Sequence, residues 1–469
     1  MANRATSTAE AASPYTFERG FPTPETIQRA YDEADLNRAV QAYRYFYPTV
    51  SMAAIWKGNE SVGVFGNKGA LLMEGSPHQL VFTPNSDTPY AGLPLDLSGG
   101  PLVVELPPGP LMCVINDLNQ RYVADLGLPG PDGGTGGKHL ILPPDYKGDV
   151  PAGYYASTSS TNRILLMLRV IPVNGDINAA FEMMKTIKVT PLNASAGWRQ
   201  PEWQELGNRQ MIGAPMQFEA NFKYWDELYE VINTEPPRDA DRNYYGELAV
   251  LGIVKGQPFN PDARMKNILE QAARMGSAQM RVQSFADRRP DREVWPDRKW
   301  EWATLRSENG TFDAPTYVDL DAREKWFYQA QIESPAMFRR TAGAGSLYWL
   351  GLKDNTGAYL DGGKSYRLTV PQPVPAKLFW SVTVYDSDTR SEIQSDLNHA
   401  ALRSMYELKD QTGTKPVDLY FGPDAPSGMR ARWIKTLPGK GWFAYFRIYG
   451  PDQAAFDGSW KPGDFERIK

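Results

Sequence analysis

The sequence predicts a mainly β protein with added helices (α+β), in which two strand-rich halves are joined by a helical middle region. Turn formers are abundant, with 41 Gly and 38 Pro among 469 residues. The 13 Trp and 24 Tyr residues favour strands, and short apolar runs between Gly/Pro turns fill both halves. A chain of this length holds two or three domains, and the composition predicts boundaries at 1–190, 191–318 and 319–469.

Charge and hydropathy exclude several classes of partner. A net charge of −5 provides no basic surface for nucleic acid, and no apolar run is long enough to span a membrane. The N-terminal segment has no apolar run, so we expect no signal peptide. The expected location is therefore cytoplasmic by default, or periplasmic if the chain has been processed. The single cysteine, Cys113, lies in an apolar run and is expected to be a small core side chain.

Helices are predicted at the N-terminus and in the middle of the chain. Thr23 as N-cap and Pro24 at the first position start one helix, and a second helix runs from about Asp35 until Pro48 ends it. The aromatic residues at 43–47 either line a pocket or pack on a sheet, and the pattern favours packing. The run Asn174-Gly175-Asp176 caps a further helix, and the middle region is helical chiefly at 217–232, 242–254 and 262–286.

Strands dominate the remaining segments. In the first half the strongest are 102–106, 111–116 and 164–173. After a helix at about 319–334, strands at 378–385 and 442–449 alternate an aliphatic face with a face of phenols, hydroxyls and a guanidinium. These polar-aromatic faces either form a ligand surface or face solvent, and the pattern alone favours solvent.

The stretch TPNSDTPY at 83–90 predicts an ordered turn that presents proton-transfer and hydrogen-bonding groups. In this hypothesis Asp87 is the general acid or base, and Asn85 and Tyr90 orient it. Asp117, which follows a strand, is the second carboxylate. The alternative for both acids is that they bond the backbone of their own turns.

Further candidates would bind the substrate. Arginine guanidinium groups are suited to anchoring a substrate carboxylate through forked donors. The polar-aromatic strand faces of the C-terminal half would complete the pocket, because pockets favour domain interfaces. The candidates are Arg121, Arg163 and Arg169 from the first half and Tyr385, Tyr445 and Arg447 from the second.

Several chemistries lack their motifs. The three histidines, His78, His139 and His399, are too far apart in the sequence for a strand-spaced metal site, so we expect no metal. His78 is the one candidate proton carrier among them, although a solvent or packing role is favoured. There is no Gly-x-Ser-x-Gly elbow and no dinucleotide fingerprint, and the glycine-rich run at 357–365 leads into a strand instead of the helix that a phosphate loop requires. We therefore expect no cofactor.

Several motifs resemble a bacterial family of two-part proteins that pairs domain of unknown function 1254 with domain of unknown function 1214. The segments 83–90, 95–98, 100–107 and 164–176 resemble its N-terminal half, and 379–386, 447–451 and 457–460 resemble its C-terminal half. The resemblance implies two β-sandwich or jelly-roll-like halves with added helices, and a homo-oligomer. Many relatives carry a secretion signal, which this sequence does not show. No catalytic residue is implied.

Three functions follow as hypotheses. The first is a cofactor-independent enzyme, a hydrolase or lyase acting on a small organic molecule by carboxylate acid/base chemistry. The second is a non-catalytic binding protein for saccharide or aromatic ligands, which would use the same Trp and Tyr surfaces. The third is an oligomeric structural protein.

Overall fold

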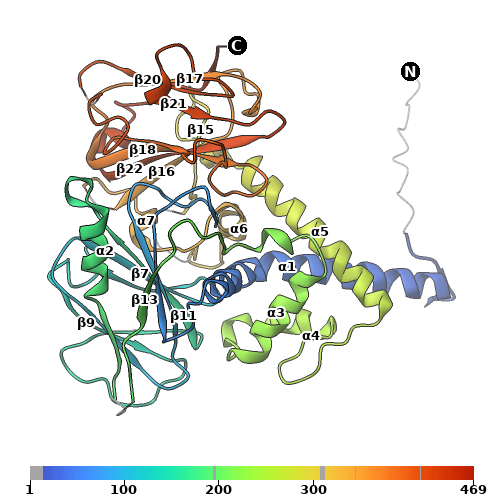
Figure 1. Cartoon of the computed structure of the whole chain (residues 1–469). Coiled ribbons are helices and arrows are strands. Elements are labelled where there is room, and N and C mark those ends of the chain that lie inside the picture. Colours follow the sequence, from blue (N-terminus) through green and yellow to red (C-terminus); the bar gives the residue numbers. More distant parts are fainter. Residues whose placement is uncertain (1–13, 194–196, 307–311, 344, 412, 469) are drawn as a thin grey trace, which may run out of the picture.

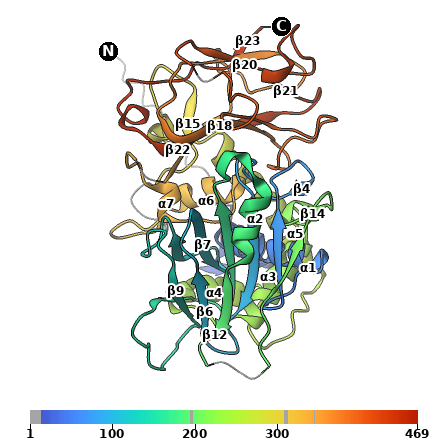
Figure 2. The same cartoon turned by 60° about the vertical axis from the view of Figure 1, so that its left-hand side comes forward.

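The computed structural model describes residues 14–193, 197–306, 312–343, 345–411 and 413–468. Two strand-rich halves lie one above the other, and helices lie beside and between them (Figures 1 and 2). The predicted fold class, strands with added helices (α+β), is confirmed. None of the described helices has the length and apolar character needed to cross a membrane.

The first half is a sandwich of two sheets. The six-stranded sheet has the order β13-β3-β5-β11-β7-β8, and the four-stranded sheet has the order β10-β9-β6-β12. The bounds of these strands are β3 Gly69–Met73, β5 Tyr90–Asp96, β6 Leu102–Leu106, β7 Leu111–Asp117, β8 Tyr122–Gly127, β9 Gly137–Leu142, β10 Tyr155–Thr158, β11 Arg163–Val170, β12 Lys188–Pro191 and β13 Glu202–Glu205.

Alternation along the strands explains how these two sheets pack. On β11, Ile164, Leu166 and Leu168 point into a core shared with the four-stranded sheet. Helix α2 (Ile177–Lys185) closes one side of this core, and the Asp176 carboxylate caps it by accepting a hydrogen bond from the Ala179 amide at 3.0 Å. The opposite face of the six-stranded sheet carries the other residues of each strand.

The second half is also a sandwich. Its five-stranded sheet has the order β15-β16-β22-β18-β19, and its four-stranded sheet has the order β21-β20-β17-β23. The ring of Trp380 stacks on Phe446 in the core between them. The bounds are β15 Trp300–Trp302, β16 Ser346–Gly351, β17 Tyr366–Val370, β18 Ala376–Asp386, β19 Ala401–Arg403, β20 Val417–Gly422, β21 Trp433–Lys435, β22 Trp442–Pro451 and β23 Glu466–Arg467.

A helical layer combines the N-terminus with the middle region. Its helices are α1 Pro24–Ser61, α3 Lys223–Thr234, α4 Arg242–Val250 and α5 Ala263–Phe285, and they share one apolar core. The prediction that Pro48 ends a helix is wrong, because α1 continues through it as one helix. The buried packing on both sides of Pro48 outweighs its missing N–H donor, and the Pro48 carbonyl accepts a hydrogen bond from Gln120.

Short elements connect these layers. They are β1 Phe17–Glu18, β2 Phe21–Pro22, β4 Gln79–Leu80, β14 Met211–Ile212, α6 Leu320–Gln329 and α7 Pro335–Phe338. Helices α6 and α7 lie between the two sandwiches (Figure 2). On α6, the fully buried Lys325 ammonium contacts Glu301 at 2.7 Å and Asp287 at 3.2 Å, which ties α6 to β15 and to the end of α5.

The polar-aromatic strand faces of the second half do not face solvent. Ser381, Thr383 and Tyr385 on β18 are fully buried, and Arg447 on β22 is 3% exposed. The favoured solvent interpretation is therefore wrong: this face of the five-stranded sheet turns toward α6, α7 and the first half. Each large sheet is thus covered on both faces, by its own sandwich partner and by the region between the halves.

Candidate functional site

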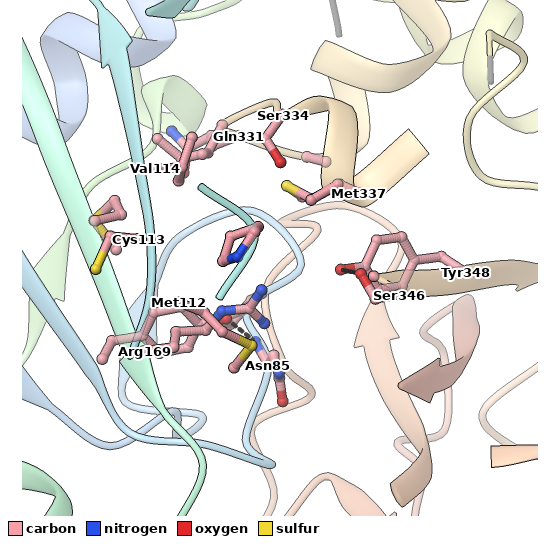
Figure 3. Close-up of a pocket in the computed structure, with 18 of the residues that line it drawn as sticks. Asn85, Met112, Cys113, Val114, Arg169, Gln331, Ser334, Met337, Ser346 and Tyr348 are labelled. Atoms are coloured by element: carbon pink, nitrogen blue, oxygen red, sulfur yellow. Dashed lines mark hydrogen bonds between the residues drawn. The ribbon is translucent and has the colours of Figure 1, made fainter. Parts of the chain in front are cut away.

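A cavity of about 700 Å³ lies between the two halves (Figure 3). The six-stranded sheet, the strands β16 and β22, the turn at 83–90 and the α6–α7 segment all contribute to its walls. Its volume is within the range of small-molecule sites, which commonly occupy such inter-domain positions.

Two adjacent rows of the six-stranded sheet form the floor. Strand register aligns side chains across neighbouring strands on one face. The first row is Met73–Tyr90–Arg169–Met112 and the second is Leu71–Gly92–Met167–Val114–Asp125. All of these residues line the cavity. The floor is therefore largely apolar, with one guanidinium and one carboxyl group.

The opposite wall comes from the second half. Ser346 pairs with Tyr449, and Tyr348 pairs with Arg447, across β16 and β22. Figure 3 shows Tyr348 and Ser346 across the cavity from Arg169 and Asn85. Tyr445 on β22 lines the cavity as well, and its hydroxyl donates to Gln329 at 2.7 Å.

The turn at 83–90 is ordered as predicted and is bound to the second half. The Arg447 guanidinium donates to the carbonyl of Thr83 at 2.9 Å and to the Tyr385 hydroxyl at 2.5 Å. The Tyr385 hydroxyl donates to the Pro84 carbonyl at 2.6 Å. The Asn85 amide donates to the Tyr449 hydroxyl. These bonds hold Asn85 and the turn at the cavity wall.

Arg169 is the cation of the floor. Its guanidinium donates to the Tyr449 hydroxyl at 3.3 Å and lies over the rings of Tyr90 and Tyr449. In the part of the chain that the structure describes, no carboxylate forms an ion pair with it. A guanidinium stays charged in proteins, so Arg169 provides a positive charge whose remaining donors are available to a ligand.

Phenols next to Arg169 add donors. The Tyr449 hydroxyl accepts from Arg169 and from the side-chain amide of Asn85, and the Tyr90 hydroxyl accepts from the backbone N–H of Asn85 at 3.3 Å. Burial raises the pKa of both phenols, so both keep their protons. Because their oxygens already accept, the O–H hydrogens of Tyr90 and Tyr449 are left to donate beside the guanidinium.

Asp125 is the carboxyl group of the floor and is 7% exposed. Burial raises its pKa to about 7, although hydrogen bonds from the Ser334 hydroxyl and the Ala336 amide, and the charge of Arg339, lower it. A carboxyl group with a pKa of about 7 has the acidity that suits a general acid or base near neutral pH.

The candidate site residues predicted from the sequence fall into two groups, those that lie at the cavity and those that lie away from it. Asn85, Tyr90, Tyr445 and Arg447 come together around the cavity, and Arg169 lies with them. Tyr385 lies behind the turn, where it supports Pro84 and Arg447. Their roles in binding stay predictions.

Asp87 is buried behind the cavity wall. It is 1% exposed, and its carboxylate accepts from the Ser381 hydroxyl at 2.6 Å. Its backbone amide donates to Asn85 at 2.5 Å. Burial raises its pKa, against the Ser381 hydrogen bond and the charges of Arg447 and Arg403. In this position Asp87 orients Asn85 and the turn.

Asp117 lies at the other end of the sheet. Its carboxylate accepts from the amides of Asn119 and Arg121, both at 2.9 Å, and from the Ser160 hydroxyl. Met112 pairs with Arg169, so five further residues of β7 place Asp117 roughly 17 Å along the strand. The structure does not bring Asp87 and Asp117 together as a carboxylate pair.

Two predicted anchors lie outside the cavity lining. The Arg163 guanidinium contacts Glu235 at 2.7 Å and thereby joins β11 to the end of α3. Arg121 lies 3.9 Å from Asp241. In both cases the charge faces a protein carboxylate and not the cavity.

The histidines do not gather. His78 is exposed beside the turn, and the His139 ring lies 3.2 Å from Asp132 in a buried pair. Among the described residues, no group of three or more His, Cys, Asp or Glu side chains is arranged to hold a metal ion.

Sequence reasoning missed Asp125, Tyr348, Tyr449, Ser334 and Ser346 as cavity residues. One signal was present, because Asp125 interrupts an apolar strand between Ala124 and Leu126. A charged residue in such a strand indicates either a solvent-facing position or a functional one. The others carry no local signal of their position.

Two family models match the chain. One, described as a protein of unknown function (DUF1254), covers residues 66–191, which hold all strands of the first sandwich except β13. The other, also described as a protein of unknown function (DUF1214), covers residues 345–453 in the second. The chain thus carries DUF1254 followed by DUF1214, which confirms the resemblance.

The chain is similar to solved structures, and one of them, with a TM-score of 0.56, shows the same fold. The VPA0106 protein of Vibrio parahaemolyticus is 18% identical, with a TM-score of 0.56 over 93% of this chain and 100% of that one. An uncharacterised protein from Burkholderia cenocepacia is 11% identical, with a TM-score of 0.40 over 94% of this chain and 96% of that one. No curated protein matches the chain.

We predict that Asp125→Asn removes a pH dependence of stability. The pKa of the carboxyl rises on folding from 3.8 to about 7. Its contribution to the free energy of unfolding is therefore complete at low pH and is lost as the pH rises from about 4 to 7, by at most about 4 kcal/mol. Urea unfolding of both proteins at pH values from 4 to 8 should show the variant gaining relative stability across this range. The exposed Asp149→Asn serves as control, and parallel curves for wild type and Asp125→Asn would contradict the prediction.

Proposed function

We propose that this protein binds a small organic carboxylate with an apolar body in the cavity between its two domains. The observation that carries the proposal is Arg169, a guanidinium on the cavity floor with no carboxylate partner among the described residues. The phenolic O–H groups of Tyr90 and Tyr449 lie beside it. Such convergent donors match a carboxylate, which accepts several hydrogen bonds at once.

The surroundings support an apolar body for the ligand. Methionines 73, 112, 167, 211 and 337 line the cavity, and their flexible thioethers adapt to varied apolar shapes. Among the exposed lining residues, Arg339 adds positive charge, and Lys377 adds an ammonium that is ion-paired with Asp452 at 3.5 Å. Leu128 and Leu378 are exposed apolar residues of the same lining. Positive charge at an entrance favours anionic ligands.

The second candidate is the cofactor-independent hydrolase or lyase. One observation favours it: Asp125, with a pKa of about 7, lines the same cavity as Arg169. Arg169 would hold the substrate carboxylate, and Asp125 would transfer the proton. Asp87, which the sequence analysis proposes as the general acid or base, would instead hold the turn in place.

Binding is tested with carboxylic acids and their primary amides as matched pairs. Wild type should bind acids more tightly, and Arg169→Met should lose about 10- to 100-fold in affinity for acids alone, because charge-assisted hydrogen bonds contribute about 1.5–3 kcal/mol. Isothermal titration gives the Kd values. Arg199→Met, which removes an exposed charge away from the cavity, is the control. Equal binding of acids and amides by wild type would contradict the proposal.

Catalysis is tested by mass spectrometry of mixtures of esters, lactones and glycosides that carry a carboxylate. If Asp125 transfers the proton, Asp125→Asn should lower turnover by about 10²- to 10⁴-fold while the Kd for a bound acid stays within about threefold. Asp87→Asn runs in parallel. Loss of turnover in Asp87→Asn with activity retained in Asp125→Asn would assign the proton transfer to Asp87.

A homo-oligomer is also proposed, through the N-terminal arm. Phe17, Phe21, Ile27 and Tyr31 are exposed together on the β1–β2 hairpin and the start of α1. Light scattering of the wild type should give a molar mass that is a multiple of the chain mass. Phe21→Ser should lower this molar mass toward that of one chain. Phe65→Ser, at another exposed aromatic residue, is the control and should change nothing. A monomeric wild type at all concentrations would contradict the proposal.

A further inference from the structure

An unpartnered hydrogen-bond acceptor lies in the cavity wall, where α1 ends. Asn59, in the last turn of α1, lines the cavity and is 2% exposed. Its Nδ2 donates to the Ile55 carbonyl at 2.8 Å, which fixes the orientation of the amide. Its Oδ1 has no hydrogen-bond partner among the described residues. A buried acceptor without a donor costs free energy, so a donor is expected there when the site is occupied.

Open floor lies in front of this oxygen. Gly92 is the one floor position without a side chain, and a Cβ added there would lie 3.9 Å from Asn59 Oδ1 and 3.4 Å from Met167 Sδ. Gly92 is the diagonal neighbour of Arg169, because Tyr90 pairs with Arg169 and precedes Gly92 by two residues. Diagonal neighbours in a sheet are about 7–8 Å apart.

The two ends therefore define a ligand with two polar groups. A carboxylate at Arg169 and a donor at Asn59 are separated by a span on the order of one aromatic ring with a short linker. Tyr90 and Met167 flank the diagonal between Arg169 and Gly92. Leu71 and Met73 extend the apolar floor on the next strand, and the thioether of Met167 offers no hydrogen bond of comparable strength. An apolar middle with polar ends fits this arrangement.

We propose that the natural ligand is a hydroxylated organic monocarboxylate, whose carboxylate binds Arg169 and whose distal hydroxyl donates to Asn59 Oδ1. This inference rests on the proposed carboxylate binding and adds the substrate class. Asn59 is a specificity residue in this scheme, since an acid lacking the hydroxyl leaves its oxygen unpaired.

Matched ligands test the inference. The probes are para-hydroxybenzoate, para-hydroxyphenylacetate and para-hydroxyphenylpropanoate, each with its para-methyl counterpart of similar shape. At one linker length or more, wild type should bind the hydroxy acid about tenfold more tightly than the methyl acid, the size of one hydrogen bond made in place of an unsatisfied acceptor. This ratio needs no variant and is independent of folding defects.

Asn59→Leu should reduce the ratio to about one and leave the Kd of the methyl acid within about threefold. A ratio near one in wild type at all three lengths would overturn the inference, as would a ratio that persists in Asn59→Leu. A preference lost only in Asp125→Asn would place the hydroxyl at Asp125 and overturn it too. If the acids bind through Arg169 with a flat ratio, only this inference fails; if no acid binds, the proposed function fails with it.

Discussion

The buried guanidinium of Arg447 is central to how the two domains meet. It lies among the rings of Tyr348, Tyr385 and Tyr445 and donates to the turn of the other domain. A guanidinium cannot shed its charge, and burying it without donors satisfied would be costly. The turn must therefore stay docked for the sheet face to remain buried, and the cavity wall forms together with that docking.

The cavity exists because the two faces of each large sheet differ in their side chains: one face packs inside its own sandwich, and the other faces the domain interface. Within each sandwich the inner faces interdigitate tightly, as Trp380 on Phe446 illustrates. Toward the domain interface the first sheet presents Gly92 and flexible methionines, which leave space where branched side chains would fill it. Arg169 introduces charge into that space without a protein counter-ion among the described residues, and under the proposed function this charge would attract an anion.

Local patterns predicted what depends on neighbours in sequence. The alternation in 442–449 and the proline-rich turn at 83–90 both specify structure within a few residues, and both were predicted correctly. What a strand face packs against cannot be predicted from nearby residues, because the side chains alternate in the same way whether the polar face meets solvent or another domain. For the same reason Asp117 and Asp125 could not be ranked: β7 carries the first to a distant turn, and the register across β8 places the second on the floor. No sequence pattern indicates that Asn59 Oδ1 lacks a hydrogen-bond partner among the described residues.

The shared walls have a thermodynamic consequence. Arg169 belongs to the DUF1254 domain and Tyr449 to the DUF1214 domain, so any molecule that contacts both acts as a bridge between them. Ligand affinity and domain docking are then reciprocally linked, and each strengthens the other by the same coupling free energy. A fragment with only one of the two domains would keep only that domain's contacts with the ligand, and the interface side of its large sheet would be exposed to solvent. Pairing of the two domains in one chain keeps their effective concentration high enough for the site to persist.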